Sequence, residues 1–178
     1  MLTFAEARRA IDHFLQSGPP HEKALAFHTP VQFDATLLPR LLATHDALNA
    51  RFAALMCLID RDADGVAIAA RDCVNQFHEL RRAESIWLYP VLARAVEQDI
   101  PARGRLMELR LATLTLARRT LRCFDELAQA LQQQVPLQPA ADRLSAALVE
   151  YLRRSEVEIY PLYSAMGLRQ VSAADRAA

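Results

Sequence analysis

The sequence has little glycine, with only four in 178 residues. A loop that cradles phosphate groups needs several closely spaced glycines, so this scarcity argues against nucleotide binding. The sequence also lacks a nucleophile elbow and any recognisable Cys-His arrangement. We therefore do not expect the protein to be an enzyme.

Cysteines are also few: Cys57, Cys73 and Cys123, with no CxxC pair among them. An odd number at irregular spacing indicates neither a disulfide framework nor a zinc site. We expect buried free thiols in a reducing compartment. No run of eighteen apolar residues and no signal-peptide pattern occurs, which predicts a cytoplasmic protein that does not cross a membrane.

An excess of charge is absent as well, because 21 acidic residues balance 21 basic ones. Without such an excess, we expect neither nucleic acid nor an anionic membrane as a partner. Hydrophobic residues make up 52% of the chain. A chain of this length and composition can bury a core of its own.

Apolar residues recur at helical rather than alternating spacing, which predicts an all-α protein. A short N-terminal helix and an extended arm are expected over residues 1–34, and a flexible tail over 168–178. Four long amphipathic helices are expected between them, with Asp64 capping the second and Asp99 the third. Their short connections predict an up-down-up-down four-helix bundle over residues 35–167.

One motif occurs twice, as "ELRRAESIWLYPVL" at 79–92 and as "YLRRSEVEIYPLY" at 151–163. In the predicted bundle, the second and fourth helices lie diagonally across the axis, so a duplicated helical hairpin would relate the copies by a pseudo-two-fold. The glutamates differ by one residue in register, because Glu84 lies six residues before Pro90 and Glu156 five before Pro161.

Three polar residues are predicted to point inward. Glu84 lies on an apolar stripe, four residues after Leu80 and three before Trp87, while Glu156 lies at the edge of its stripe and His45 on the stripe of the first helix. A carboxylate on an apolar face is costly unless it is paired, protonated or bound to a metal. Inward carboxylates and a histidine from three helices are typical of metal sites in bundles.

With these residues on three helices, the sequence resembles the hemerythrin-like (HHE cation-binding) family over about residues 36–166. The resemblance depends on His45-Asp46-x-Leu, "FHELRRAESIWLYPVL" and "EYLRRSEVEIYPLY". Members of that family hold a non-haem di-iron centre for oxygen binding, sensing or iron handling. The resemblance implies that His45, Glu84 and Glu156 are ligands of non-haem iron or another divalent cation, with His78 a weaker candidate.

Most histidines of the family site are missing from this sequence. Leu80 and Leu152 stand four residues before the two glutamates, where the family has histidine, and no histidine follows His78. The family site uses five histidines and two carboxylates, so we do not expect a standard di-iron oxygen carrier. His78 itself lies six residues from Glu84, about 120° away around a helix, on the flank of the stripe.

Two functions therefore stay open. One is a degenerate cation-binding or sensing module that uses the inward histidine and glutamates. The other is a metal-free helical-bundle regulator that binds a protein partner in signalling, in which Glu84 pairs with an arginine such as Arg110; bacterial regulators that bind the housekeeping sigma factor are bundles with related packing. A homodimer formed through the N-terminal helix is a further expectation. Three aromatic residues are expected in the core or an interface: Trp87, Tyr89 and Tyr160.

Overall fold

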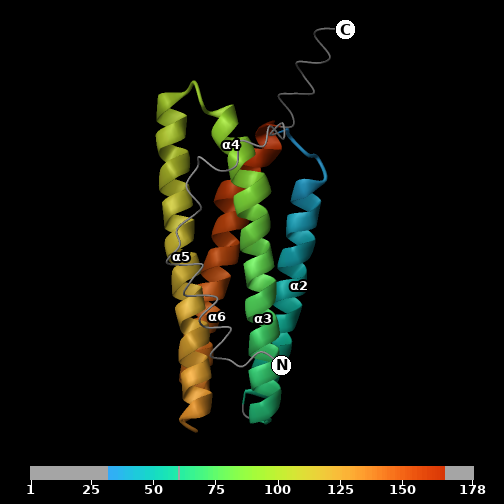
Figure 1. Ribbon diagram of the computed structural model, residues 1–178, viewed down its shortest axis with the longest axis vertical. Coiled ribbons are helices and arrows are strands. Elements are labelled where there is room, and N and C mark those ends of the chain that lie inside the picture. Colours follow the sequence, from blue (N-terminus) through green and yellow to red (C-terminus); the bar gives the residue numbers. More distant parts are fainter. Residues whose placement is uncertain (1–31, 60, 167–178) are drawn as a thin grey trace, which may run out of the picture. The chain divides into compact units, whose positions relative to one another are not determined.

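The computed structural model describes residues 32–59 and 61–166 of the chain. The chain divides into two units, Met1–Pro30 and Val31–Ala178, and the described residues belong to the second. They form helices and no strand, which confirms the predicted all-α class (Figure 1). The predicted N-terminal helix, nearly all of the arm and the predicted tail at 168–178 lie outside the described residues.

Four long helical segments account for most of the described residues, and they begin close to the expected positions. Two of them contain a short π-helical turn. None of the described helices combines the length and the apolar composition needed to cross a membrane. In chain order the elements are α2 (Leu37–Leu58), α3 (Ala63–Ala83), η1 (Glu84–Leu88), α4 (Tyr89–Ala95), α5 (Ile100–Gln132), α6 (Gln138–Arg154), η2 (Ser155–Ile159) and a last helical stretch at 160–166.

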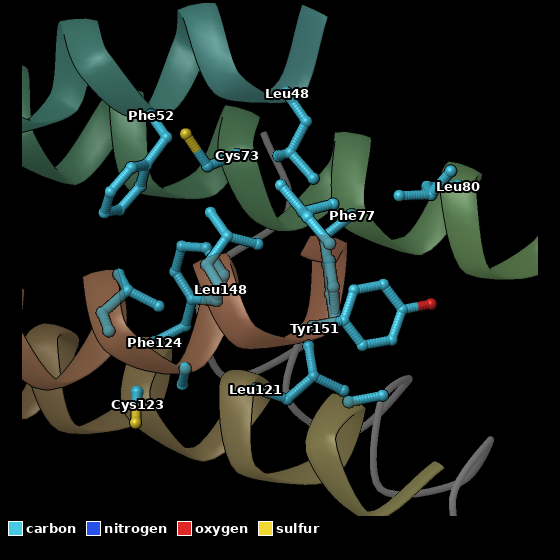
Figure 2. Close-up of a cluster of buried hydrophobic side chains, with 14 of the residues drawn as sticks. Leu48, Phe52, Cys73, Phe77, Leu80, Leu121, Cys123, Phe124, Leu148 and Tyr151 are labelled. Atoms are coloured by element: carbon cyan, nitrogen blue, oxygen red, sulfur yellow. The ribbon is translucent and has the colours of Figure 1, made fainter. Parts of the chain in front are cut away.

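The inward faces of these segments build one apolar core. α2 packs along α3, α5 packs along α6, and α3 also contacts α5. Burial of each large apolar side chain contributes about 1.5–3 kcal/mol, so the segments are held together mainly by this core. The described residues thus form a helical bundle. Figure 2 shows core side chains from all four segments directed toward one another, among them Leu48 and Phe52 of α2, Phe77 of α3, Phe124 of α5 and Leu148 of α6.

Aspartates cap the first turns of α3 and α5. The Asp62 side chain accepts a hydrogen bond from the Gly65 N–H at 3.0 Å, and the Asp99 side chain accepts one from the Ala102 N–H at 2.9 Å. The predicted cap at Asp99 is confirmed. The predicted cap at Asp64 is wrong, because Asp62 has the extended backbone of a cap and Asp64 lies inside the first turn. A side chain at position 65 would collide with the capping carboxylate.

Both copies of the repeated motif contain a π-helical turn. The Tyr89 N–H donates to the Glu84 carbonyl in the first copy, and the Tyr160 N–H donates to the Ser155 carbonyl in the second. This bonding inserts one extra residue into the helix. A proline follows directly in both copies, and its ring crowds the carbonyl four residues earlier, which lies inside the π turn. The π turns therefore coincide with the point where proline interrupts the α-helical ladder.

Because Tyr-Pro follows directly after both π turns, the two copies of the motif are aligned by superposing Pro90 on Pro161. Ser155, and not Glu156, is then the counterpart of Glu84, and these two side chains are both buried. The extra residue also changes which side chains face inward: Leu88 is buried, whereas Trp87 is 58% exposed. The prediction that Trp87 shares the inward stripe with Glu84 is therefore wrong.

Replacing Asp99 by Ala should lower the free energy of unfolding by about 1 kcal/mol, because α5 loses the side-chain acceptor for the Ala102 N–H. Urea denaturation followed by circular dichroism measures this change. Glu97→Ala is the matched control, since Glu97 is exposed and precedes the cap by two residues. We expect less than about 0.5 kcal/mol there. Equal losses in the two variants would contradict the assignment of the cap.

Candidate functional site

The structure brings together the three main ligand candidates of the sequence, His45, Glu84 and Glu156. They come from α2, η1 and η2, and two tyrosines join them by hydrogen bonds: Tyr151 of α6 and Tyr160 just after η2. We call these five residues the inner network. Four of them are buried, and the Glu156 side chain is 46% exposed.

The buried carboxylate of Glu84 accepts hydrogen bonds from both tyrosines. The Tyr160 hydroxyl donates to Oε1 at 2.9 Å, and the Tyr151 hydroxyl donates to Oε2. The two phenols thereby offset much of the cost of burying this carboxylate. The expected pairing of Glu84 with Arg110 is wrong, because the Arg110 guanidinium lies over the ring of Tyr89, 5.4 Å from its centroid. Within the described residues, Glu84 has no ion pair.

The His45 ring links this carboxylate to the surface. Its Nε2 lies 2.8 Å from the Tyr160 hydroxyl oxygen, and its Nδ1 lies 3.0 Å from Oε1 of Glu156. Tyr160 has one hydroxyl proton and donates it to Glu84, so its oxygen accepts from the Nε2–H of His45. A continuous chain of hydrogen bonds therefore runs from a half-exposed carboxylate to the buried Tyr151.

The tyrosines of the network remain hydrogen-bond donors over a wide pH range. Burial raises the pKa of Tyr151 and that of Tyr160 well above the usual value, and the negative charge of Glu84 raises both further. Burial likewise raises the pKa of the neighbouring Tyr89 to about 12. Each phenol thus keeps its proton, which a hydrogen bond to a carboxylate requires.

The repeat explains how the donor and the acceptor come to face each other. When the copies are aligned on Tyr-Pro, Leu80 and Glu84 of the first correspond to Tyr151 and Ser155 of the second. One copy supplies the carboxylate and the other supplies the phenol. The Ser155 hydroxyl is buried and has no hydrogen-bond partner among the described residues. Tyr151 is absent from the residues predicted for the site, because matching the glutamates of the two copies pairs Glu84 with Glu156. Alignment on the prolines places this tyrosine at the position of Leu80.

Tyr151 belongs both to the network and to the apolar core. Its ring packs edge-on against Phe77, with the ring centroids 4.9 Å apart. Figure 2 shows the ring within the apolar cluster and the hydroxyl directed out of it. The core therefore fixes the position of the ring, and the ring in turn aims a donor at Glu84.

His78 makes no hydrogen bond to the inner network, as its flanking position predicts. Its Nε2 is buried and has no hydrogen-bond partner within the described residues. Burial lowers the pKa of His78, the positive charge of Arg81 lowers it further, and Glu79 opposes the shift. A neutral imidazole is therefore favoured in the folded protein.

The cysteines follow the prediction in two cases out of three. Cys73 and Cys123 are buried free thiols, whereas Cys57 is exposed, so the expectation of burial is wrong there. Burial raises the pKa of the Cys73 thiol to about 11. That thiol remains protonated at neutral pH and is therefore a poor nucleophile.

A shallow pocket of about 420 Å³ opens beside the exposed end of the inner network. Leu38 and Leu42 of α2 form one wall, and Leu42 is 40% exposed. The opposite wall comes from the end of the fourth segment and includes Glu156 and Tyr160. The pocket gives solvent access to the Glu156 end of the hydrogen-bonded chain.

The inner network does not fit the di-iron centre of the family that the sequence resembles. Leu80 and Leu152 are buried where that family has histidine. Both carboxylate oxygens of Glu84 and both ring nitrogens of His45 already have partners in the chain. Within the described residues, no cluster of three or more histidine, cysteine or acidic side chains is arranged to hold a metal ion. The assignment of His45, Glu84 and Glu156 as ligands stays a prediction.

Replacing Tyr160 by Phe should lower the free energy of unfolding by about 2–3 kcal/mol, because Glu84 loses a donor and His45 loses its acceptor. The matched control is Tyr163→Phe, which removes two 2.9 Å hydrogen bonds between the hydroxyl and the Asp34 backbone, one donated to the carbonyl and one accepted from the N–H. It leaves no buried carboxylate short of a donor and should cost about 1–2 kcal/mol. Urea denaturation of both variants gives the comparison. A loss at Tyr160 no larger than that at Tyr163 would contradict this account of the network.

His78 should make the protein less stable in mild acid. Its folded pKa lies below the ordinary value of 6.5, so the unfolded chain binds the proton more readily and stability declines as pH falls through this range. In His78→Gln this contribution is absent. Denaturation of both proteins at pH 7 and pH 5 should show a larger decline for the wild type. Equal declines would rule out His78 as the source.

Comparisons of the chain with protein-family models, curated proteins and solved structures find no match. The resemblance to the hemerythrin-like family therefore stays a prediction from the repeated motif and His45.

Proposed function

We propose that the bundle is a metal-independent regulatory module that binds a protein partner, and that its inner network stands where hemerythrin-like proteins hold iron. The observation that carries this proposal is that both oxygens of Glu84 and both ring nitrogens of His45 take part in hydrogen bonds within the chain. Groups that satisfy one another in this way stabilise a scaffold and disfavour ligation of a metal ion.

The proposed arrangement of the bundle is up-down-up-down. Two observations support it: α2 packs along α3 and α5 packs along α6, and only a few residues separate the members of each pair. Short connections between helices that pack together favour antiparallel neighbours. In this arrangement the two π turns lie on segments that run parallel, as a duplicated hairpin requires.

Metal binding would have to overcome the existing hydrogen bonds. A metal ion would compete with the two tyrosine donors for the oxygens of Glu84, and the ring of His45 would have to turn away from Tyr160 or Glu156. Hydrogen bonds to a carboxylate are about twice as strong as those between neutral groups, so this rearrangement opposes ligation. The missing histidines remove the ligands that could compensate for it.

A second candidate function is the binding of a divalent cation at the edge of the bundle. The observation that favours it is the exposure of Glu156, whose carboxylate lines the pocket beside α2. One carboxylate and one imidazole form a weak site, so the bound ion would retain most of its water. We regard this function as secondary to the metal-independent one.

Elemental mass spectrometry of protein purified without a histidine tag, before and after anaerobic loading with ferrous iron, separates the two functions. We expect no stoichiometric metal and no change in thermal unfolding after loading. Bound iron that is lost in Glu84→Gln or in Glu156→Gln and retained in Glu158→Gln would contradict the proposal. Glu158 is a matched control because it lies in the same π turn as Glu156 and pairs with Arg154 at 3.1 Å.

A further inference from the structure

The solvent face of α5 carries a stripe of exposed apolar side chains. Ile100 is 81% exposed, Met107 64% and Leu111 63%, the highest values among the large hydrophobic residues of the described part of the chain. Together with Gly104 they follow one another at spacings of four, three and four residues, which places them on one side of the helix. The core face of α5 lies on the other side, where Leu106 and other residues are buried.

Gly104 leaves room for a close approach at the middle of this stripe. A side chain at this position would meet nothing within 4 Å, so the packing of the bundle does not require glycine. Glycine within a helix costs about 1 kcal/mol relative to alanine. The missing side chain lowers the surface between Ile100 and Met107 and forms a hole into which a side chain of another helix can insert.

The part of α5 that carries the stripe is positively charged. The segment from Ile100 to Arg122 contains six arginines and a single acidic residue, Glu108, which gives a formal charge of 6 − 1 = +5 in a chain whose formal net charge is zero. All six arginines are exposed, and no ion pair is formed by any of them within the described residues. The arginines are Arg103, Arg105, Arg110, Arg118, Arg119 and Arg122.

We infer that this face of α5 binds an acidic amphipathic helix of a partner protein. Such a helix would place apolar side chains at alternating three- and four-residue spacing against Ile100, Met107 and Leu111, and its flanking aspartates and glutamates would meet the arginines. The inference rests on the proposed regulatory function, for which it supplies the chemistry of the partner.

The charge pattern favours this occupant over a second copy of the chain. A two-fold contact between two α5 faces would bring two segments of charge +5 together, and like charges across a helix pair are destabilising. The apolar stripe is also narrow, and seven residues after Leu111 the same side of the helix carries Arg118 in place of an apolar residue. A helix that lies in a membrane surface has a wider apolar face, commonly with aromatic residues.

The test uses the full chain and two synthetic peptides of about three heptads, both with leucine at the a and d positions. One peptide carries glutamate at the e and g positions and the other carries lysine. We expect the acidic peptide to bind with at least tenfold higher affinity in fluorescence anisotropy, to shift the amide resonances of α5, and to bind less tightly at high salt.

Leu111→Glu should weaken the binding of the acidic peptide at least tenfold. Val149→Glu, a matched change at an exposed position of α6, should leave it unchanged.

Three results would overturn the inference. They are no binding of the acidic peptide, equal affinity for both peptides, and an affinity for the acidic peptide that is unchanged in the Leu111→Glu variant. Dimerisation in light scattering that Leu111→Glu abolishes would assign the face to a second copy. Binding to anionic vesicles or to duplex DNA in place of the peptide would assign it to those ligands. A failure here leaves the metal content unchanged, so it is distinguishable from failure of the metal-independent function, which mass spectrometry reports.

Discussion

The structure depends on one constraint, the burial of the Glu84 carboxylate in the middle of a helical bundle. Only 2% of this residue is exposed, and an unpaired charge in such a place would cost far more than the stability of a typical domain allows. Two phenols from the fourth segment supply the compensation. One of them, Tyr160, also contacts His45 and so connects α2 to the same point. Three of the four segments are thereby joined through a single carboxylate.

This connection gives the bundle something that its apolar core alone does not. Apolar side chains tolerate exchange and small displacements, since contact between them is not directional. Hydrogen bonds to Glu84 require Tyr151 and Tyr160 at defined heights along the helix axis. Sliding the fourth segment by one turn would break both bonds, so the network fixes the register of that segment relative to the second. The π turns contribute because they set the rotation of Tyr160 about its helix.

The sequence predicts the helices well and the inner network only in part. Helical periodicity and the Asp99 cap locate the segments, because both are local properties of the chain. The inward positions of His45 and Glu84 also follow from periodicity. The exposure of Trp87 does not, since a π turn shifts the helical phase and leaves no mark in the composition. Tyr151 and the true partner of Glu84 depend on contacts between distant segments, which a stripe on one helix does not specify.

The arginines of α5 have a consequence that reaches beyond direct contact. A chain of zero net charge with +5 gathered on residues 100–122 of α5 has a permanent electric dipole. In dilute salt, such a dipole turns the molecule in the field of an approaching anionic body before the surfaces meet. A larger fraction of encounters then begins at α5 than the fraction of the molecular surface that α5 provides. Neutral overall charge and fast, oriented encounter are thus compatible in one small protein.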